Sequence, residues 1–302
     1  MLTRADGSRS VSIDVCVCTF RRPSLTATLT SIACQEGVAG PIRIVVADND
    51  DQPSARSMVD AARAMGLDIQ YVHAPARNIS VARNACLEAA TGELLAFIDD
   101  DEVADQRWLA GLVAALDAAP DAVAAFGPVR AVYPPDAPEW VLEADLHSTR
   151  PVQTAAGIDT GYTSNAMIRR AAIGDLRFDV SLGRSGGEDT DFFTRLHRKG
   201  LRFTEAPQAV VSEEAVPDRL RIGWLATRAF RSGQTHARRY LGTPATRLAA
   251  TAKALAKCAY CLSVAAWNAG SPVRWRKSWV RAALHAGAVC RLVGVREGRL
   301  YG

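Results

Sequence analysis

Three consecutive aspartates, Asp99, Asp100 and Asp101, stand with Glu102 directly after the apolar run 94–98. Ionised carboxylates at this spacing repel one another, and a divalent cation that shares their charge relieves the repulsion. Because side chains of an extended chain alternate, Asp99 and Asp101 can face one ion or the diphosphate that it carries. Oxygen ligands of this kind suit Mg²⁺ or Mn²⁺. The alternative is a solvated acidic turn at the end of a strand.

Alternating strand and helix patterns would position these groups. Apolar runs predict strands at 13–19, 42–47, 67–72 and 94–98, and helical patterns lie between them at 24–35, 54–65 and 80–90. This alternation predicts an α/β fold with a mainly parallel, Rossmann-like sheet that has helices on both faces.

Each predicted strand ends in a polar cluster, at 19–22, 48–51, 77–84 and 99–102. The carboxyl ends of parallel strands meet at one edge of a sheet, and ligands of open α/β sheets bind at that edge. We therefore expect the four clusters to converge on one site.

As an ordered set, these motifs resemble the family 2 glycosyltransferases of the GT-A fold, and among them the bacterial enzymes that build cell-surface polysaccharides. The resemblance covers roughly residues 11–215 of the chain. The matching stretches are 15–22, 45–49, 78–84, 97–101 and 187–189. Each stretch alone is a weak signal, and their order along the chain is the specific one.

The resemblance implies a donor site and a metal site. The donor-binding residues would be Thr19, Arg22, Asp48, Asn49, Arg77, Asn78, Arg83, Asp99 and Asp100. Among them Asp48 would receive the base and the ribose, and Arg83 would reach the diphosphate, which suits its forked donors. Asp101 with Asp99 would hold Mn²⁺ or Mg²⁺. The alternatives are a plain turn aspartate for Asp48 and a solvated helix face for Arg77 and Arg83.

By the same resemblance Asp189 is the catalytic base, with Glu188 beside it as a second candidate. Both follow the glycine-rich run 183–187 and precede the helical pattern 190–196. Transfer of a sugar to a hydroxyl needs one group that takes the acceptor proton, and a carboxylate within hydrogen-bond reach can do so. Since the metal-bound diphosphate leaves without a proton, one base suffices, and a single in-line displacement inverts the anomeric centre. The alternative is that both acids are helix caps.

The segment 211–217 resembles the place where related enzymes bring a further polar residue, often histidine, toward the metal. Glu214 is the candidate here, and the alternative is a surface glutamate before a proline-started helix. Acceptor selectivity is expected in the segment 133–162, which has no clear periodicity.

Charge divides the chain at about residue 214. Residues 1–214 hold 20 basic and 30 acidic side chains, whereas residues 215–302 hold 16 basic and two acidic ones. The basic part is rich in alanine and helical in pattern. Basic faces beside Leu and Trp suit helices that lie in the headgroup layer of an anionic membrane. The alternatives are a solvated helical cap and a nucleic-acid surface, and no nucleic-acid module accompanies the charge.

Two segments of this tail carry the amphipathic pattern. In 244–267, one face repeats leucines and the other side carries basic residues: Leu248, Leu255 and Leu262 against Arg247, Lys253 and Lys257. After a break at 270–272, Trp275 and Trp279 share a face. The longest uncharged stretch, 258–273, is too short and interrupted to predict a membrane span.

With 302 residues and 48% hydrophobic content, the chain can bury a full core and is expected to hold one catalytic domain with an appendage. We divide it into a disordered segment 1–10, a nucleotide-sugar half 11–115, an acceptor half 116–214 and a basic helical tail 215–302. The polar first ten residues predict no signal peptide. Seven cysteines, mostly within predicted strands and helices, indicate reduced thiols and a cytoplasmic protein.

These observations predict an inverting, metal-dependent glycosyltransferase, peripheral on the cytoplasmic face of the plasma membrane. We expect a nucleotide-diphospho-sugar donor, a UDP-sugar first, a lipid-linked saccharide acceptor and no nucleic-acid partner. One alternative is a sugar nucleotidyltransferase, which would show a glycine-rich loop after the first strand, and 20–23 has no glycine. The other is a non-catalytic scaffold for nucleotide sugars and membrane partners, against which intact Asp99, Asp101 and Asp189 argue.

Overall fold

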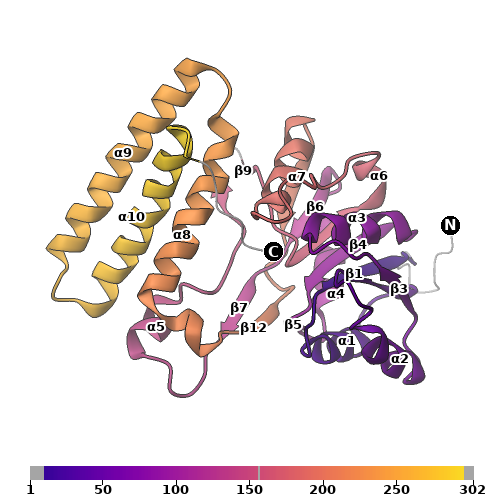
Figure 1. Cartoon of the computed structure of the whole chain (residues 1–302). Helices are drawn as coiled ribbons and strands as arrows, with labels where there is room; N and C mark the ends of the chain where they lie inside the picture. The colour runs from indigo at the N-terminus through magenta and orange to yellow at the C-terminus, as the bar shows by residue number, and fades with distance from the viewer. Residues whose placement is uncertain (1–9, 156, 296–302) are drawn as a thin grey trace.

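A seven-stranded sheet forms the centre of residues 11–214 in the computed structural model, which describes residues 10–155 and 157–295 (Figure 1). The predicted disordered segment lies outside the described residues except for Ser10. The sheet order is β11-β6-β10-β4-β1-β2-β3. Its strands are β1 (Ile13–Thr19), β2 (Ile42–Asp48), β3 (Ile69–His73), β4 (Leu94–Asp99), β6 (Ala122–Phe126), β10 (Asn165–Arg169) and β11 (Arg202–Glu205). Only β10 runs antiparallel to its neighbours, so the predicted mainly parallel sheet is confirmed.

Helices cover both faces of this sheet because its strands are apolar on both sides. On one face, Val15 and Val17 of β1 pack under three helices: α1 (Leu25–Ala33), α2 (Arg56–Ala64) and α4 (Trp108–Ala118). On the other face, Cys16 of β1 packs with α3 (Ile79–Ala89) and α7 (Glu188–Arg198). Strands from both predicted halves share the sheet, and the division at residue 115 stays a prediction.

The first helices differ from the predicted ranges at their ends. α1 begins after Ser24, whose side chain makes no cap hydrogen bond, and α2 begins two residues later than expected, at Arg56. α3 begins one residue early, because Asn78 caps it by accepting from the backbone N–H groups of Ser80 and Val81.

A three-stranded sheet adjoins the carboxyl edge of the main one. Its order is β5 (Glu102–Ala104), β12 (Val211–Glu214) and β7 (Val129–Val132), with β12 antiparallel to β5 and parallel to β7. The segment that lacked periodicity holds only short elements: α5 (Glu139–Ala144), β8 (Gln153–Thr154) and β9 (Gly157–Ile158). Two more short helices are α6 (Arg170–Ile173) and the 3₁₀ helix η1 (Pro217–Leu220).

The basic tail is a folded helical cap beside the sheet domain (Figure 1). It contains α8 (Ile222–Ala237), the 3₁₀ helix η2 (Arg238–Tyr240), α9 (Pro244–Trp267) and α10 (Pro272–Leu292). α10 packs against both α8 and α9, and α9 is the outermost helix. The predicted helical tail is thus confirmed as helical, but its helices pack on one another.

The cap also contacts the acceptor segment through α5. The guanidinium of Arg276 lies between the rings of Trp140 and Trp275, 4.8 and 4.6 Å from their centroids. Next to it, Lys277 Nζ donates to the carbonyl oxygen of Glu143 at 3.3 Å. Arg276 and Lys277 therefore bind α10 to α5.

Two glycines allow α8 and α10 to approach closely. A Cβ at Gly233 would lie 1.8 Å from the carbonyl oxygen of Leu284, and a Cβ at Gly287 would lie 1.8 Å from that of Phe230. No side chain larger than hydrogen fits at either position without separating the helices.

We expect Gly233→Ala to lower the melting temperature of the cap, because forcing a methyl group into a packed contact costs about 1–3 kcal/mol. Gly223→Ala is the matched control on the same helix, since its added Cβ meets nothing within 4 Å and alanine favours a helix by about 1 kcal/mol over glycine. Thermal unfolding followed by circular dichroism compares the two. Equal melting temperatures would contradict the close packing.

Candidate active site

The strand ends bring the predicted clusters to one edge. In the parallel ladders Thr19 lies beside Asp48, and Cys18 lies beside Asp99. The first residues of the loops after β1, β2 and β4 are therefore neighbours in space. This edge is where the sequence placed the site.

The three aspartates after β4 divide by direction, as strand alternation predicts. Asp100 is buried and turns toward β1, where its Oδ2 accepts from the Phe20 N–H at 3.4 Å. Asp99 and Asp101 are half-buried and lie on the open side. Arg22 approaches the group, with Nη2 3.5 Å from Asp101 Oδ2 and Nε 3.8 Å from Asp100 Oδ1.

Negative charge at this edge exceeds what the nearby arginines compensate. Loss of solvent contact raises the pKa of Asp99 to about 7 and that of Asp100 to about 6, and Asp101 adds to both shifts by repulsion. Glu102 folds under the turn, where its Oε2 accepts from the Asp99 N–H at 2.9 Å. Burial raises the pKa of Glu102 well above its usual range, and its hydrogen bond to the Asp99 N–H shapes the turn.

Asp99 and Asp101 fit a Mg²⁺ or Mn²⁺ ion that takes few ligands from the protein. Among the described residues no group of three or more His, Cys, Asp or Glu side chains is placed to hold a metal by itself. Mg²⁺ is commonly bound through one or two carboxylates, with waters and substrate phosphates completing its shell. The two carboxylates on the open side are that kind of donor set.

On β12 Glu213 lies nearer the aspartates than the predicted metal ligand Glu214, whose role stays a prediction. Glu213 lies opposite Glu102 in the ladder, and repulsion from Asp101 adds to the burial that raises its pKa. Glu214 is exposed, because successive side chains of a strand point to opposite faces. Val211 and Glu213 are two residues apart and share one face of the strand, so the apolar Val211 in the sequence already indicated that Glu213 faces inward.

Arg83 connects the aspartates to α7. Its side chain and that of Glu188 are both buried and form an ion pair, while Arg83 Nη2 lies 3.9 Å from Asp99 Oδ1. The guanidinium also lies over the ring of Phe178, 5.7 Å from its centroid. Glu188, predicted as a catalytic candidate, is thus placed to neutralise and orient Arg83, and its own pKa is raised by burial.

Asp189 is the less buried acid of the pair at the start of α7. Its Oδ1 accepts from the Thr190 N–H at 2.6 Å, inside the first turn of α7, whose N-cap is Gly187. It also lies close enough to Arg83 to raise the pKa of that guanidinium. This hydrogen bond leaves the other carboxylate oxygen available, so it does not exclude a role as the base.

The loop before Asp189 is supported by the cap, which the sequence did not indicate. Gly186 and Gly187 both have a φ of 86°, which glycine adopts readily. Arg238 donates from Nη1 to the Gly186 carbonyl oxygen and from Nη2 to Ser185 Oγ, both at 3.2 Å. A Cβ at Gly187 would meet Thr235 of α8 at 2.4 Å. α8 therefore determines where the loop can lie.

Asp48 is turned inward by its own loop. Its side chain is buried, with Oδ1 accepting from the Asp50 N–H at 3.1 Å and Oδ2 accepting from the Ala55 N–H and the Tyr71 hydroxyl, each at 2.8 Å. It holds the turn after β2. A contact with the base would need this turn to open, and that contact stays a prediction.

The remaining predicted donor residues tie neighbouring loops together. Asn49 Oδ1 accepts from the Asn78 N–H at 3.2 Å, and Asn78 Nδ2 donates to the Val180 carbonyl oxygen at 2.8 Å. Arg77 pairs with Asp51 at 2.6 Å. Thr19 is buried, and its hydroxyl has no hydrogen-bond partner within the described residues. The site that the fold gathers consists of the aspartates, Arg22, Arg83 and Asp189.

Comparison with known proteins decides the family. Residues 14–177 match the model of the family described as Glycosyl transferase family 2. The chain belongs to glycosyl transferase family 2. It is 45% identical to the succinoglycan biosynthesis protein ExoM of Rhizobium meliloti (strain 1021), over 98% of this chain and 97% of that protein. It is also 24% identical to the glucosyl-dolichyl phosphate glucuronosyltransferase of Haloferax volcanii, over 74% and 75% of the two chains.

Solved structures show that this glycosyltransferase has the predicted GT-A fold. The mannosyltransferase PcManGT of Pyrobaculum calidifontis, in complex with GDP-Man and Mn²⁺, aligns with a TM-score of 0.64 at 23% identity, over 94% of this chain and 88% of its own. TarS of S. aureus (residues 1–349), in complex with UDP, aligns with a TM-score of 0.53 at 16% identity, over 96% and 98%. Family membership decides against a sugar nucleotidyltransferase and a non-catalytic scaffold.

In this glycosyltransferase, Asp189→Asn should separate donor binding from chemistry. Asparagine has nearly the same shape and can still accept from the Thr190 N–H, but it cannot take a proton. We expect donor affinity to stay within a few-fold and turnover to fall on the order of 10²–10⁴-fold. Calorimetric donor titration and initial rates measure the two quantities. An equal loss in both would make Asp189 a structural cap.

Proposed function

We propose that the enzyme is an inverting, divalent-metal-dependent glycosyltransferase of polysaccharide synthesis, which moves a sugar from a nucleotide-diphospho-sugar to a saccharide acceptor. The observation that carries the proposal is the half-buried carboxylate pair Asp99 and Asp101, with Asp99 3.9 Å from buried Arg83 and Asp189 near that guanidinium at the start of α7. Similarity to the succinoglycan biosynthesis protein supports polysaccharide synthesis. GDP-Man and UDP in the related structures support a nucleotide sugar, and we retain UDP-sugar as the first candidate.

Each residue then has one task. Asp101 and Asp99 would hold Mn²⁺ or Mg²⁺, which when bound offsets the charge of the diphosphate. Arg83 is kept charged and oriented by Glu188, and its free donors can bind diphosphate oxygens as they come within reach. Asp189 accepts the proton of the acceptor hydroxyl. With one base and a leaving group that needs no proton, the displacement is direct and inverts the anomeric centre, unlike the two-carboxylate hydrolases.

The test is a screen of nucleotide sugars with Mn²⁺ by thermal shift, followed by transfer assays. A bound donor raises the melting temperature by mass action, and we expect UDP-sugars to do so only with the metal present. Asp101→Ala should abolish transfer and the metal-dependent shift, whereas Asp99→Ala should weaken both. Asp117→Ala, at an exposed position of α4, is the control. If Asp101→Ala retains wild-type turnover, the metal assignment is wrong.

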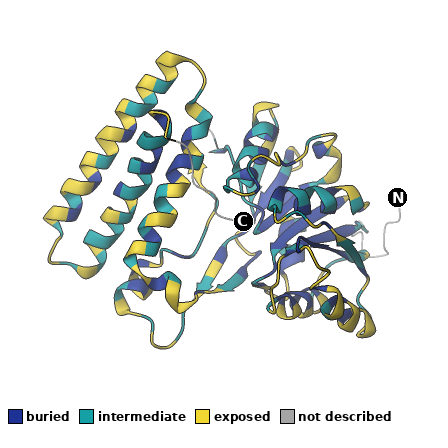
Figure 2. Ribbon diagram, viewed as in Figure 1, coloured by how far each residue is buried: buried dark blue, intermediate teal, exposed yellow. Residues whose placement is uncertain are grey.

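We also propose that the enzyme is peripheral on the cytoplasmic face of the plasma membrane, with α9 as the contact. The outer face of α9 carries exposed apolar side chains: Leu248, Leu255, Tyr260, Leu262 and Trp267, the last 91% exposed (Figure 2). Lys253 and Lys257 are exposed beside them. Anionic headgroups attract such lysines while the apolar side chains enter the interface.

α9 is better suited to lie along a membrane than to cross it. Among the described residues it is long and apolar enough to cross by length and composition alone. However, it packs along α10, and its Arg247 binds the carbonyl oxygen of Leu292 at the end of that helix. A spanning α9 would take Lys253 and Lys257 into hydrocarbon. A protein lying flat on the membrane would meet a lipid-linked saccharide directly, which supports that acceptor.

Charge reversal on α9 tests this contact. We expect Lys253→Glu with Lys257→Glu to weaken binding to phosphatidylglycerol vesicles on the order of tenfold or more, since each basic residue near the surface contributes about 1 kcal/mol. Arg276 and Lys277 stay unchanged because they pack on α5. Lys199→Glu, at the exposed residue that follows α7, is the control. Vesicle co-sedimentation at low and high salt measures the effect.

Absence of vesicle binding by the wild-type enzyme at low salt would overturn the membrane proposal. The exposed face of α9 would then be a contact between copies of the chain, which light scattering would show as a dimer.

A further inference from the structure

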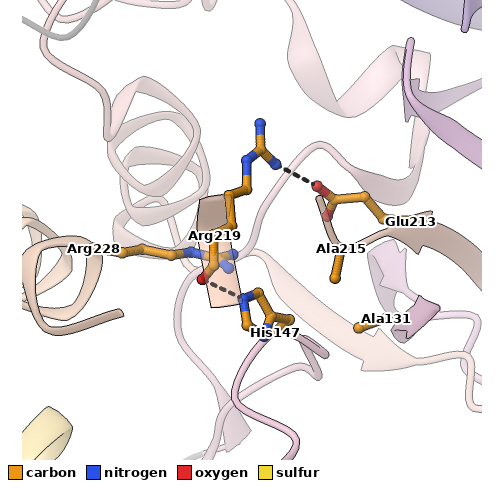
Figure 3. Close-up of a pocket in the computed structure, with 6 residues that line it drawn as sticks. All are labelled: Ala131, His147, Glu213, Ala215, Arg219 and Arg228. Carbon is orange, nitrogen blue, oxygen red and sulfur yellow. Dashed lines mark hydrogen bonds and ion pairs between the residues drawn. The ribbon is translucent and has the colours of Figure 1, made fainter. Parts of the chain in front are cut away.

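A recess lies between the small sheet and the cap, and it shares Glu213 with the acidic strand edge beside it (Figure 3). Its enclosed part is small, about 10 Å³, which is room for one water molecule, so a larger ligand would bind at its open mouth. The lining residues come from β7, the segment before β8, β12, η1 and α8: Ala131, His147, Glu213, Ala215, Arg219 and Arg228. Neither of its two arginines, Arg219 and Arg228, has a role in the donor, metal or base assignments above.

One arginine of the recess is held in place by its neighbours. Arg219 Nη1 donates to Glu213 Oε1 at 2.9 Å, and its guanidinium lies 5.7 Å from the ring centroid of Trp224. The backbone is held as well, because His147 Nε2 lies 3.0 Å from the Arg219 carbonyl oxygen. Burial and the two arginines lower the pKa of His147, so the ring is neutral and Nε2 is the donor.

The other arginine, Arg228, has guanidinium N–H groups that bind no acceptor within the described residues. Arg228 extends from α8 to the mouth of the recess, where it is exposed (Figure 3). Its guanidinium lies 5.5 Å from the centroid of the Trp224 ring. Within the described residues its guanidinium makes no hydrogen bond and no ion pair. A guanidinium in a recess with unused forked donors suits a bidentate oxyanion, above all a phosphate.

The charge of the recess also favours an anion. Two guanidiniums face one carboxylate, Glu213, which is itself repelled by Asp101. His147 is neutral and adds none. The recess therefore has surplus positive charge directly beside the acidic edge, on the far side of Glu213 from it.

We propose that this recess binds a phosphate group of the acceptor, the one through which the saccharide is attached to its lipid. The inference rests on the proposed function. The donor diphosphate has its own partners at the strand edge, in Arg22, Arg83 and the metal-binding aspartates. The recess instead uses α8, a helix of the same cap whose outer helix carries the exposed apolar face. A phosphate anchored in a membrane would reach the site from that direction.

The test is calorimetric titration of the full-length enzyme with farnesyl phosphate, farnesol and inorganic phosphate. We expect farnesyl phosphate to bind more tightly than either farnesol or inorganic phosphate. Arg228→Ala should weaken farnesyl phosphate on the order of 10- to 100-fold, and Arg228→Lys should weaken it less. Affinity for UDP with Mn²⁺ should not change.

Two controls separate this site from other surfaces. Arg231→Ala removes an exposed arginine of the same helix that is not part of the recess, and it should bind farnesyl phosphate as the wild type does. The α9 double reversal Lys253→Glu with Lys257→Glu should do so too, because α9 does not line the recess.

Three results would overturn the inference. A parallel loss of UDP–Mn²⁺ affinity in Arg228→Ala would assign the recess to the donor diphosphate. If inorganic phosphate binds as tightly as farnesyl phosphate, the recess is a simple anion site that does not recognise a lipid phosphate. If Arg228→Ala leaves the affinity for farnesyl phosphate unchanged, the recess does not bind the phosphate. Because these titrations need no turnover, they stand apart from the transfer assays, whose failure would instead refute the proposed function.

Discussion

The buried ion pair of Arg83 with Glu188 is the interaction on which the catalytic edge depends. An unpaired guanidinium in this position would be costly, so α3 and the start of α7 must stay together. The same arginine reaches toward Asp99 at the end of β4, which places three distant parts of the chain around one point. Asp189 follows Glu188 directly, and its position is therefore determined by the same pair.

The cap is part of this arrangement through the glycine loop. Arg238 and Thr235 at the end of α8 restrict residues 185–187, and α8 is held by its close contact with α10. Arg239 adds a salt bridge to Asp159 within the segment 133–162, and α10 contacts α5 of the same segment. A helical region that the charge pattern suggested as a membrane tail thus also shapes the active site. Its outermost helix keeps an apolar face free while its inner helices pack.

Much of the fold followed from local pattern. The strands that end at Thr19, Asp48 and Asp99 were predicted within a residue, because strands buried on both faces are continuous apolar runs. Convergence of their polar ends followed from parallel topology. Strand alternation exposes Glu214 and turns Glu213 inward, and the role of Glu214 at the metal stays a prediction. The pairing of Arg83 with Glu188, 105 residues apart, had no sequence signal.

By itself the sequence determined the parallel half of the sheet from β1 to β4, the family and the position of the acidic edge, since these depend on periodicity and short ordered motifs. Tertiary structure alone decided which polar side chains serve the fold and which remain available for chemistry. The side chains of Asp48, Asn78 and Glu188 make close contacts of 3.1 Å or less inside the chain. Those of Asp99 and Asp101 have only long contacts, to Arg83 and Arg22, and that of Arg228 makes no hydrogen bond or ion pair within the described residues. Residue type and spacing are the same in both cases. The difference lies in whether a distant segment supplies a partner, which only packing can settle.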